Sequence, residues 1–175
     1  MTNYRPICDV WLLARTRTGY YGAYPYGFLQ RARDLIGCGL KDRVLHVCSG
    51  AIKKYPFSGY GSNDRTVDIN GELDPDYVMD VSKELPKGNW EGVLVDTPYS
   101  EEEAKNYGDF PYPEPNKLLR DIERIIEPGI KVGVLHYFPP RPPKTMRLVA
   151  LVAVMTGYKN RVRVFSVFEK KEREK

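Results

Sequence analysis

The sequence GVLVDTPYS, residues Gly92–Ser100, indicates the fold class more directly than any other segment. It begins with a short apolar run that contains two valines, as in a parallel strand buried on both faces. A polar turn with Pro98 follows, and Ser100 precedes a run of glutamates, which is typical of a capped helix N-terminus. The segment therefore predicts a strand, a tight turn and a helix in succession.

Short apolar runs and helical patterns alternate in the same way along most of the chain. Further strands are predicted at Val44–Val47, Thr66–Ile69, Tyr77–Val81 and Lys131–Tyr137, and helices at Tyr26–Ile36, Ser100–Asn106 and Asn116–Ile126, the last with Gly129 as its C-terminal breaker. The runs Met146–Met155 and Arg161–Phe168, separated by turn-like residues, predict an antiparallel hairpin. We therefore expect an α/β fold with an open, mostly parallel sheet and a C-terminal antiparallel hairpin.

Length and composition indicate one globular domain over residues 1–175, in which residues 1–40 are an N-terminal aromatic and helical segment. Hydrophobic residues make up 42% and charged residues 29% of the chain, a balance that excludes a disordered or fibrous protein. No apolar run reaches the ~18 to 20 residues of a membrane span, and no signal-peptide layout is present at the start. These features predict a cytoplasmic protein without a membrane partner.

Metal and hydrolase chemistry find little support in the sequence. The three cysteines are widely spaced and the only histidines are His46 and His136, so no zinc pattern can be built and we expect no metal. No serine stands in a Gly-x-Ser-x-Gly turn, which disfavours the Ser-His-Asp hydrolases.

Charge is distributed unevenly along the chain. The net charge is +4 over residues 1–44, −7 over residues 45–138 and +7 over residues 139–175. Basic ends around an acidic middle indicate contact with a polyanion. The predicted cationic rim comprises Arg141, Lys144, Arg147, Arg161 and Arg163, interleaved with Tyr55, Tyr60, Tyr107 and Tyr112.

Polar residues follow the predicted strands at the points where those strands end. In an open parallel sheet, ligands bind outside these carboxyl ends. Asp68 is placed to accept hydrogen bonds from two vicinal ribose hydroxyls, and Asp80 from an exocyclic adenine amine. Because the pattern Gly-x-Gly-x-x-Gly of dinucleotide sites is absent, a nucleoside without phosphates is the favoured ligand.

The turn Asp96-Thr97-Pro98-Tyr99 resembles motif IV of the class I S-adenosylmethionine-dependent amino methyltransferases, in which Asp/Asn/Ser-Pro-Pro-aromatic follows the fourth strand. The resemblance implies that Asp96 and a backbone carbonyl at Thr97 or Pro98 accept hydrogen bonds from the amine of the substrate. It also implies that Pro98 stiffens the turn and that Tyr99 stacks on an extruded base. Thr97 replaces the commoner proline and still supplies a carbonyl.

Two further segments resemble the same superfamily. Val44–Gly50 (VLHVCSG) resembles motif I, although a histidine stands where many relatives have an acid and no second glycine follows soon. Tyr24–Leu29 (YPYGFL) looks like the aromatic-proline motif X. Together with LHYFPP and MTGYKNRVRVFSV, these segments are similar to a group of small DNA methyltransferase-like proteins of prokaryotes and phages.

This resemblance implies a set of residues around S-adenosylmethionine and around a substrate base. The cofactor residues would be Tyr24, Pro25, His46, Cys48, Ser49, Gly50, Asp68, Asp80 and Val81. The substrate residues would be Tyr99, His136, Phe138 and Arg141, and the aromatic loop Tyr107–Pro113 would be a lid.

The activity that the resemblance implies is methyl transfer to an exocyclic amine of a nucleic-acid base. Adenine N6 in DNA comes first, with cytosine N4 in DNA and guanine N2 in RNA as alternatives, whereas Asp96 and the basic flanks disfavour a protein glutamine substrate. The short interval between Gly50 and Asp96 leaves no room for a target-recognition domain, so the protein would either read little sequence or take its specificity from a separate subunit or a second copy. The alternative is a weakly active or inactive subunit of a methyltransferase complex that binds cofactor and nucleic acid, because His46 and the missing glycine depart from the family pattern.

Overall fold

The computed structural model describes residues 5–19, 22–55, 58–157 and 161–172. Its strands are β1 (Ile7–Leu12), β2 (Val44–Val47), β3 (Arg65–Asp68), β4 (Tyr77–Val78), β5 (Gly92–Val95), β6 (Lys131–His136), β7 (Met146–Met155) and β8 (Arg163–Lys170). Its α-helices are α1 (Phe28–Ile36), α2 (Glu101–Ala104) and α3 (Pro115–Ile125), and single 3₁₀ turns lie at η1 (Ile52–Lys54) and η2 (Gly71–Leu73). None of the helices in these ranges is long and apolar enough to cross a membrane.

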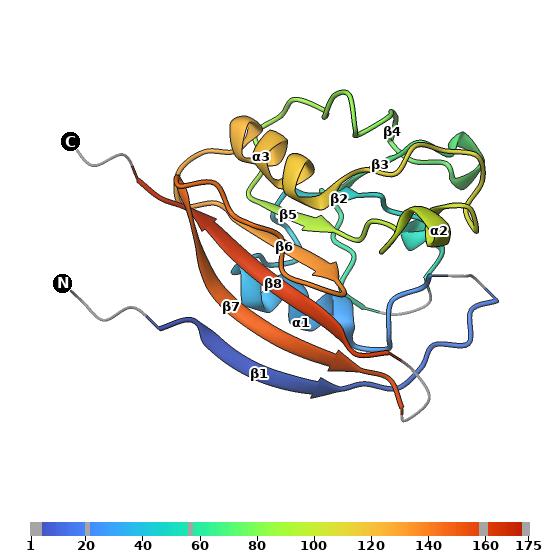
Figure 1. The fold of residues 1–175 in the computed structure, drawn as a ribbon, viewed down its shortest axis with the longest axis horizontal. Coiled ribbons are helices and arrows are strands. Elements are labelled where there is room, and N and C mark those ends of the chain that lie inside the picture. The colour runs from blue at the N-terminus through green and yellow to red at the C-terminus, as the bar shows by residue number, and fades with distance from the viewer. Residues whose placement is uncertain (1–4, 20–21, 56–57, 158–160, 173–175) are drawn as a thin grey trace.

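The described strands form one sheet in the order β1-β7-β8-β6-β5-β2-β3-β4. Strand β8 pairs antiparallel with both of its neighbours, and the other pairs are parallel. The predicted open parallel sheet with a C-terminal antiparallel hairpin is therefore confirmed, although part of the predicted turn, residues 158–160, lies outside the described residues. The carboxyl ends of β2, β5 and β6 point to the right-hand edge of the sheet in Figure 1.

Strand β1 departs from the sequence analysis, which assigned residues 1–40 to an aromatic and helical segment. It pairs in parallel with β7, from Ile7 opposite Ala150 to Leu12 opposite Met155. The local sequence ICDVWL does not alternate with period two, and the partner strand comes from the far end of the chain. This strand was not predicted from the sequence, because the hydrogen bonds that make the segment a strand come from pairing with a distant part of the chain.

Several predicted boundaries also move. Helix α1 begins at Phe28 because Gly27 before it adopts a left-handed conformation with φ of 76°. Helix α2 is a single turn, and the predicted Ser100 cap is confirmed, since its hydroxyl accepts a hydrogen bond from the Glu103 amide. Gly129 does not cap α3 but lies in the turn before β6, where its amide donates to the Lys170 carbonyl at 2.8 Å.

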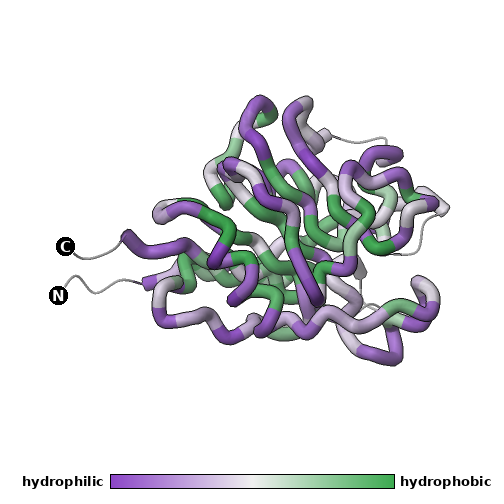
Figure 2. Tube along the Cα trace, turned by 90° about the horizontal axis from the view of Figure 1, so that it is seen from above, coloured by the Kyte–Doolittle hydropathy of each residue, from purple (hydrophilic) through white to green (hydrophobic). Residues whose placement is uncertain are grey.

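Each face of the sheet carries its own apolar core. Helix α1 covers one face and α3 covers the other, as Figure 1 shows. The α1 core includes Phe28, Leu29, Leu94, Leu135 and Phe165, and the α3 core includes Leu45, Val93, Leu118, Ile122 and Val132. Figure 2 shows hydrophobic segments mostly in the interior of the molecule and hydrophilic ones mostly at its periphery.

A buried ionic network fastens α1 to β2 and to the turn before β3. The Asp64 carboxylate accepts two hydrogen bonds from Arg33 Nη1, at 2.8 and 2.6 Å, and one from the Gly61 amide at 2.7 Å. His46 Nε2 lies 2.9 Å from Asp64 Oδ2. Burial by itself raises the pKa of Asp64, but the hydrogen bonds from His46, Arg33 and Gly61 hold this pKa below its usual value.

We expect Asp64→Asn to lower the free energy of unfolding by about 3–5 kcal/mol, because the change leaves the buried Arg33 guanidinium without its anionic partner. Urea unfolding followed by circular dichroism measures this loss. The matched control is Asp34→Asn on the exposed side of α1, which should change the stability by less than ~0.5 kcal/mol. Equal effects of the two variants would show that the network contributes no specific stability.

Candidate active site

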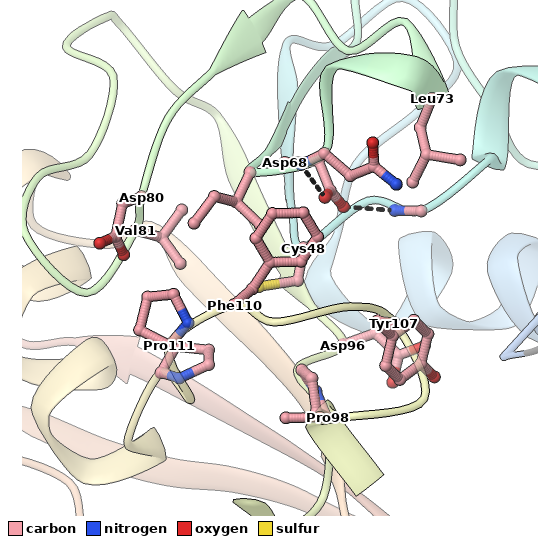
Figure 3. A pocket seen from close by; sticks show the side chains of 15 residues that line it. Cys48, Asp68, Leu73, Asp80, Val81, Asp96, Pro98, Tyr107, Phe110 and Pro111 are labelled. Atoms are coloured by element: carbon pink, nitrogen blue, oxygen red, sulfur yellow. Dashed lines mark hydrogen bonds between the residues drawn. The ribbon is translucent and has the colours of Figure 1, made fainter.

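A cavity opens at the carboxyl ends of β2, β3 and β5. It encloses about 680 Å³ of space, open solvent at its mouth included. Its lining comprises Cys48, Gly50, Asp68, Ile69, Asn70, Leu73, Asp80, Val81, Asp96, Pro98, Ala104, Tyr107, Phe110, Pro111 and Pro113. Figure 3 shows Asp80 and Val81 at one end of this cavity and Asp96 and Pro98 at the other.

The turn after β2 forms one wall of the cavity. Gly50 has a left-handed φ of 53°, and its amide donates to Asp68 Oδ2 at 2.9 Å (Figure 3). Cys48 is also left-handed, with φ of 55°, which costs a residue with a side chain of order 1–3 kcal/mol. Cys48 therefore adopts a conformation that usually selects glycine.

The Cys48 thiol remains protonated at neutral pH. Burial raises its pKa well above the usual value, and the nearby carboxylates of Asp68, Asp96 and Asp80 raise this pKa further. A neutral, buried thiol is a poor nucleophile and behaves as a small apolar group. Cys48 therefore serves as a wall of the cavity.

Asp68 holds two loops together and still has free acceptor sites. Its Oδ2 accepts from the Gly50 amide, and its Oδ1 accepts from the Asn70 amide at 3.0 Å. An ionised carboxylate offers about four acceptor positions, so roughly two remain for a ligand. Because Asp68 lines the cavity, these positions are suited to a pair of neighbouring hydroxyl groups.

The far end of the cavity combines a charged acceptor with apolar surfaces. Burial by itself raises the pKa of Asp80, but hydrogen bonds from Ser82 and the ammonium group of Lys83 lower it, so Asp80 is ionised. Val81 stands beside it, and Phe110 and Pro111 of the predicted lid line the same cavity. This arrangement suits a flat heteroaromatic ring with an amino group.

The predicted lid is part of the cavity wall and reaches across to another segment. Tyr107 lies so close to Gly22, which precedes α1, that a Cβ atom on Gly22 would be 2.5 Å from the Tyr107 hydroxyl. Gly22 also has a left-handed φ of 81°. The loop after α2 therefore packs against the segment between β1 and α1 through a position that only glycine fits.

Asp96 directly follows β5. Its carboxylate accepts from a single side-chain donor among the described residues. The Tyr99 hydroxyl donates to Asp96 Oδ1 at 2.9 Å, and Arg163 Nη1 donates to that hydroxyl at 3.4 Å. Burial raises the pKa of Asp96 to about 7, although Arg163 and the Tyr99 hydrogen bond act in the opposite direction. Asp96 is therefore poised to exchange its proton near neutral pH.

Aromatic side chains surround Tyr99 and Asp96. The Tyr99 ring lies 4.6 Å from the Tyr137 ring and 5.4 Å from the ring of His136. Burial lowers the pKa of His136 to about 4, so this ring is neutral. Tyr24 is buried and stacks on Phe28 at 4.9 Å.

A second, wider depression lies on the other side of the turn Asp96–Tyr99. We call it the arginine groove, and its lining comprises Arg15, Thr16, Arg17, Thr18, Gly19, Gly22, Ala23, Pro25, Tyr99, Glu103, Tyr137, Thr156, Arg161 and Arg163. Asp96 and Pro98 line the first cavity, whereas Tyr99 lines the arginine groove. The turn Asp96–Tyr99 is therefore the partition between two sites.

The structure brings together only part of the predicted set of residues. Cys48, Gly50, Asp68, Asp80, Val81, Asp96 and Pro98 line the cavity, and Pro25 and Tyr99 line the arginine groove. Phe138 stands next to the site, 44% exposed, with its ring 4.3 Å from that of His136. Tyr24 and His136 are buried and line neither the cavity nor the arginine groove.

Other predicted residues lie away from both sites. His46 is paired with Asp64 in the core and does not line the cavity, because Asp64 and not a ligand supplies its polar partner. Ser49 and Thr97 are buried outside the two linings, and the Thr97 hydroxyl has no hydrogen-bond partner among the described residues. Arg141 is exposed near α3, where its amide donates to Asn116 Oδ1 at 2.8 Å.

The predicted cationic rim is also only partly assembled. Arg161 and Arg163 line the arginine groove, but Arg147 pairs with Glu169 at 3.0 Å near the start of β7, at the opposite end of the strands. Tyr55 and Tyr60 pack against the α1 core. Arg15 and Arg17 also line the arginine groove but were not among the predicted site residues. Their sequence signal is a basic pair directly after an apolar run. Among the described residues, no cluster of His, Cys, Asp or Glu could hold a metal ion.

Comparison with protein-family models and with curated proteins finds no match to this chain. Among solved structures, TrmN from Thermus thermophilus matches 81% of this chain and 48% of its own chain, at 17% identity and a TM-score of 0.55. This chain therefore spans about half the length of TrmN.

Two further structures match over more of their own length. N-methyltransferase NodS from Bradyrhizobium japonicum WM9, in complex with S-adenosylhomocysteine, matches over 81% of this chain and 86% of its own, at 8% identity and a TM-score of 0.56. A SAM-dependent O-methyltransferase from Thermotoga maritima matches over 90% and 70%, at 10% identity and a TM-score of 0.54. The chain has the Rossmann-like fold of these methyltransferases.

We expect the Asp96 carboxyl group to titrate near pH 7, because its burial disfavours the charged form. Tyr99→Phe removes a hydrogen bond that favours the carboxylate, so the midpoint should move to higher pH. Carboxyl ¹³C chemical shifts measured against pH test both statements, with Tyr112→Phe as a control that leaves the midpoint unchanged. A midpoint for Asp96 near that of an exposed aspartate, ~4, would contradict the assignment.

Proposed function

We propose that this protein is an S-adenosylmethionine-dependent methyltransferase that acts on an exocyclic amine of a nucleic-acid base. One observation carries the proposal: the turn Asp96–Tyr99 separates a cavity lined by Asp68 and Asp80 from a groove rich in arginine. A methyl donor in the cavity and a substrate in the groove would then meet at this turn. The resemblance of the turn to motif IV supports the same assignment.

The residues of the cavity fit S-adenosylmethionine. The two free acceptor positions of Asp68 suit the ribose hydroxyls, and Asp80 suits the adenine amine. Val81 and Phe110 supply apolar surface for the adenine ring. The turn Cys48–Gly50 lies at the end of β2, next to Asp68, and suits the methionine part. S-adenosylhomocysteine bound to NodS, a protein of the same fold, supports this choice of ligand.

When bound, S-adenosylmethionine supplies a methyl group on a positively charged sulfur. Asp96 in its ionised form accepts a hydrogen bond from the substrate amine, which increases the electron density on the attacking nitrogen. Because the Tyr99 hydroxyl takes one acceptor position of Asp96 Oδ1, the other oxygen, Oδ2, is the less occupied acceptor for the amine. A backbone carbonyl at Thr97 or Pro98 would be the second acceptor. The new nitrogen–methyl bond would replace the sulfur–methyl bond, the neutral thioether S-adenosylhomocysteine would be the leaving group, and the ionised Asp96 would accept the proton that the amine gives up.

Adenine N6 in DNA is the first choice of substrate, with cytosine N4 and an RNA base as the next candidates. All three are planar amines conjugated to a ring, for which hydrogen bonds to the N–H groups have the same effect. Sequence specificity would come from a separate subunit or a second copy, and the protein would act in the cytoplasm.

The two departures that favoured a non-catalytic subunit have structural explanations. His46 replaces an acid, but it is paired with the buried Asp64. No second glycine follows soon after Gly50, but the turn is held by the hydrogen bond from the Gly50 amide to Asp68 Oδ2 at 2.9 Å. Both observations support an active enzyme.

We expect purified protein to bind S-adenosylmethionine and S-adenosylhomocysteine in titration calorimetry. Asp68→Ala should weaken this binding at least ~tenfold, because it removes a charged acceptor and releases the Gly50 amide. Glu72→Ala, an exposed carboxylate in the neighbouring turn η2, is the matched control and should bind normally. Unchanged affinity of the Asp68 variant would reject the ribose assignment.

We expect Asp96→Ala to reduce transfer of a labelled methyl group to nucleic acid by at least ~100-fold, because the acceptor for the substrate amine is lost. The affinity for S-adenosylmethionine should change little, so calorimetry on the same variant separates a lost substrate contact from a lost cofactor site. In the wild type, transfer should increase as the pH passes through about 7, since only the ionised Asp96 is active. Substantial residual transfer by the variant would disprove the role of Asp96.

A further inference from the structure

We propose that the arginine groove binds an unpaired strand of nucleic acid, whose phosphates contact Arg15, Arg17 and Arg161. The proposal rests on the proposed function in one respect, namely that a target base of the bound strand must reach Asp96. Binding of the strand itself depends on the groove alone.

The charge of the groove is the first argument. Its described lining contains four arginines and one carboxylate, Glu103. Glu103 is already engaged, since it accepts a hydrogen bond from the Tyr137 hydroxyl at 2.9 Å and lies 3.7 Å from Arg161. Arg15 and Arg17 are exposed and have no ion-pair partner in the part of the chain that the structure describes. A concave surface with uncompensated guanidinium groups attracts phosphates, which arginine binds through paired N–H donors.

The size of the groove favours a polymer over a small anion. It encloses about 1,980 Å³, open solvent included, against about 680 Å³ for the cavity on the other side of the turn. The arginines also come from two separate segments, one after β1 and one at the start of β8. Several phosphates along a strand would meet such a surface better than a single phosphate would.

The position of Asp96 favours an unpaired strand over a duplex. Asp96 is half-buried and lines the cavity, whereas Tyr99, which donates to Asp96 Oδ1, lines the arginine groove, so a base in the groove must pass the Tyr99 side chain to bring its amine to the carboxylate. A paired base would first have to leave its stack, at a cost of a few kcal/mol that an unpaired base avoids. The groove also presents two aromatic side chains, Tyr99 and Tyr137, whose rings lie 4.6 Å apart. A cationic groove with aromatic side chains is typical of sites for single strands.

Pairing of β1 with β7 is what creates the groove. Leu12 lies opposite Met155 at the carboxyl ends of these strands, so the residues that follow Leu12 line one groove together with Thr156 and Arg161. The two basic ends of the sequence, residues 1–44 and 139–175, therefore contribute their arginines to one surface. The uneven charge along the chain becomes a concentrated charge in the structure.

The test is fluorescence anisotropy with a labelled DNA strand of about 20 nucleotides, long enough to span a typical single-strand site. The same sequence is also tested as a duplex and as an RNA strand. The groove variant is Arg15→Gln/Arg17→Gln/Arg161→Gln, and the matched control is Lys87→Gln/Arg120→Gln/Arg124→Gln, which removes three exposed cations elsewhere. Unchanged calorimetry with S-adenosylmethionine shows that both variants are folded.

We expect a single strand, of DNA or of RNA, to bind at least ~tenfold more tightly than the duplex. The groove variant should lose at least ~tenfold in affinity, and its plot of log Kd against log salt should be shallower by about 2, since each phosphate contact contributes ~0.7. The control should bind as the wild type does. Equal or tighter binding of the duplex, or equal losses in groove variant and control, would overturn the proposal.

The outcome is separable from that of the proposed function. The wild type could bind the strand through the groove and yet neither bind S-adenosylmethionine nor transfer methyl groups. This result would support the proposed strand site and reject the proposed methyltransferase activity. Circular dichroism would then verify that the variants are folded. If the protein transfers methyl groups and the groove variant binds the strand as tightly as the wild type, the methyltransferase activity would be supported and the strand site rejected.

Discussion

A carboxylate removed from water must be paired with hydrogen-bond donors or give up its charge, and this constraint separates the buried Asp64 from the half-buried Asp96. Asp64 has donors from Arg33, His46 and the Gly61 amide, which hold its pKa below the usual value. Asp96 accepts only from Tyr99 among the described side chains, and burial raises its pKa to about 7. The first residue therefore holds the fold together, while the second is left with an acceptor site to offer.

The sheet places these groups where they can act together. Strands β2, β3 and β5 end side by side, so the turns that follow them form one cavity with Asp68 and Asp96 in its wall. Strand β8 runs in the opposite direction, so it begins at this edge and brings Arg163 to Tyr99. The antiparallel strand thus contributes a cation to a site that the parallel strands build.

Two residues in and directly after β2 depend on contacts with other segments of the chain. His46 stands at a motif I position, yet its partner Asp64 comes from the turn before β3, so the pair is invisible in either segment alone. Cys48 tolerates a left-handed backbone because the hydrogen bond from the Gly50 amide to Asp68 holds the turn around it. The tertiary contacts of these turns replace what the usual residue types provide locally.

Local patterns were sufficient to predict strands β2 to β6 and the terminal hairpin, because apolar runs are properties of short segments. They were also sufficient to place Asp68, Asp80 and Asp96 near strand ends, where these residues line the cavity. They were not sufficient for β1, which depends on pairing with a strand from the far end of the chain. Nor could they place Arg15 beside Arg161, or show that Tyr99 lies between Asp96 and Arg163. Hydrogen bonds and charges that join distant segments exist only once the chain has folded, and here they shape both the reactive carboxylate and the arginine groove.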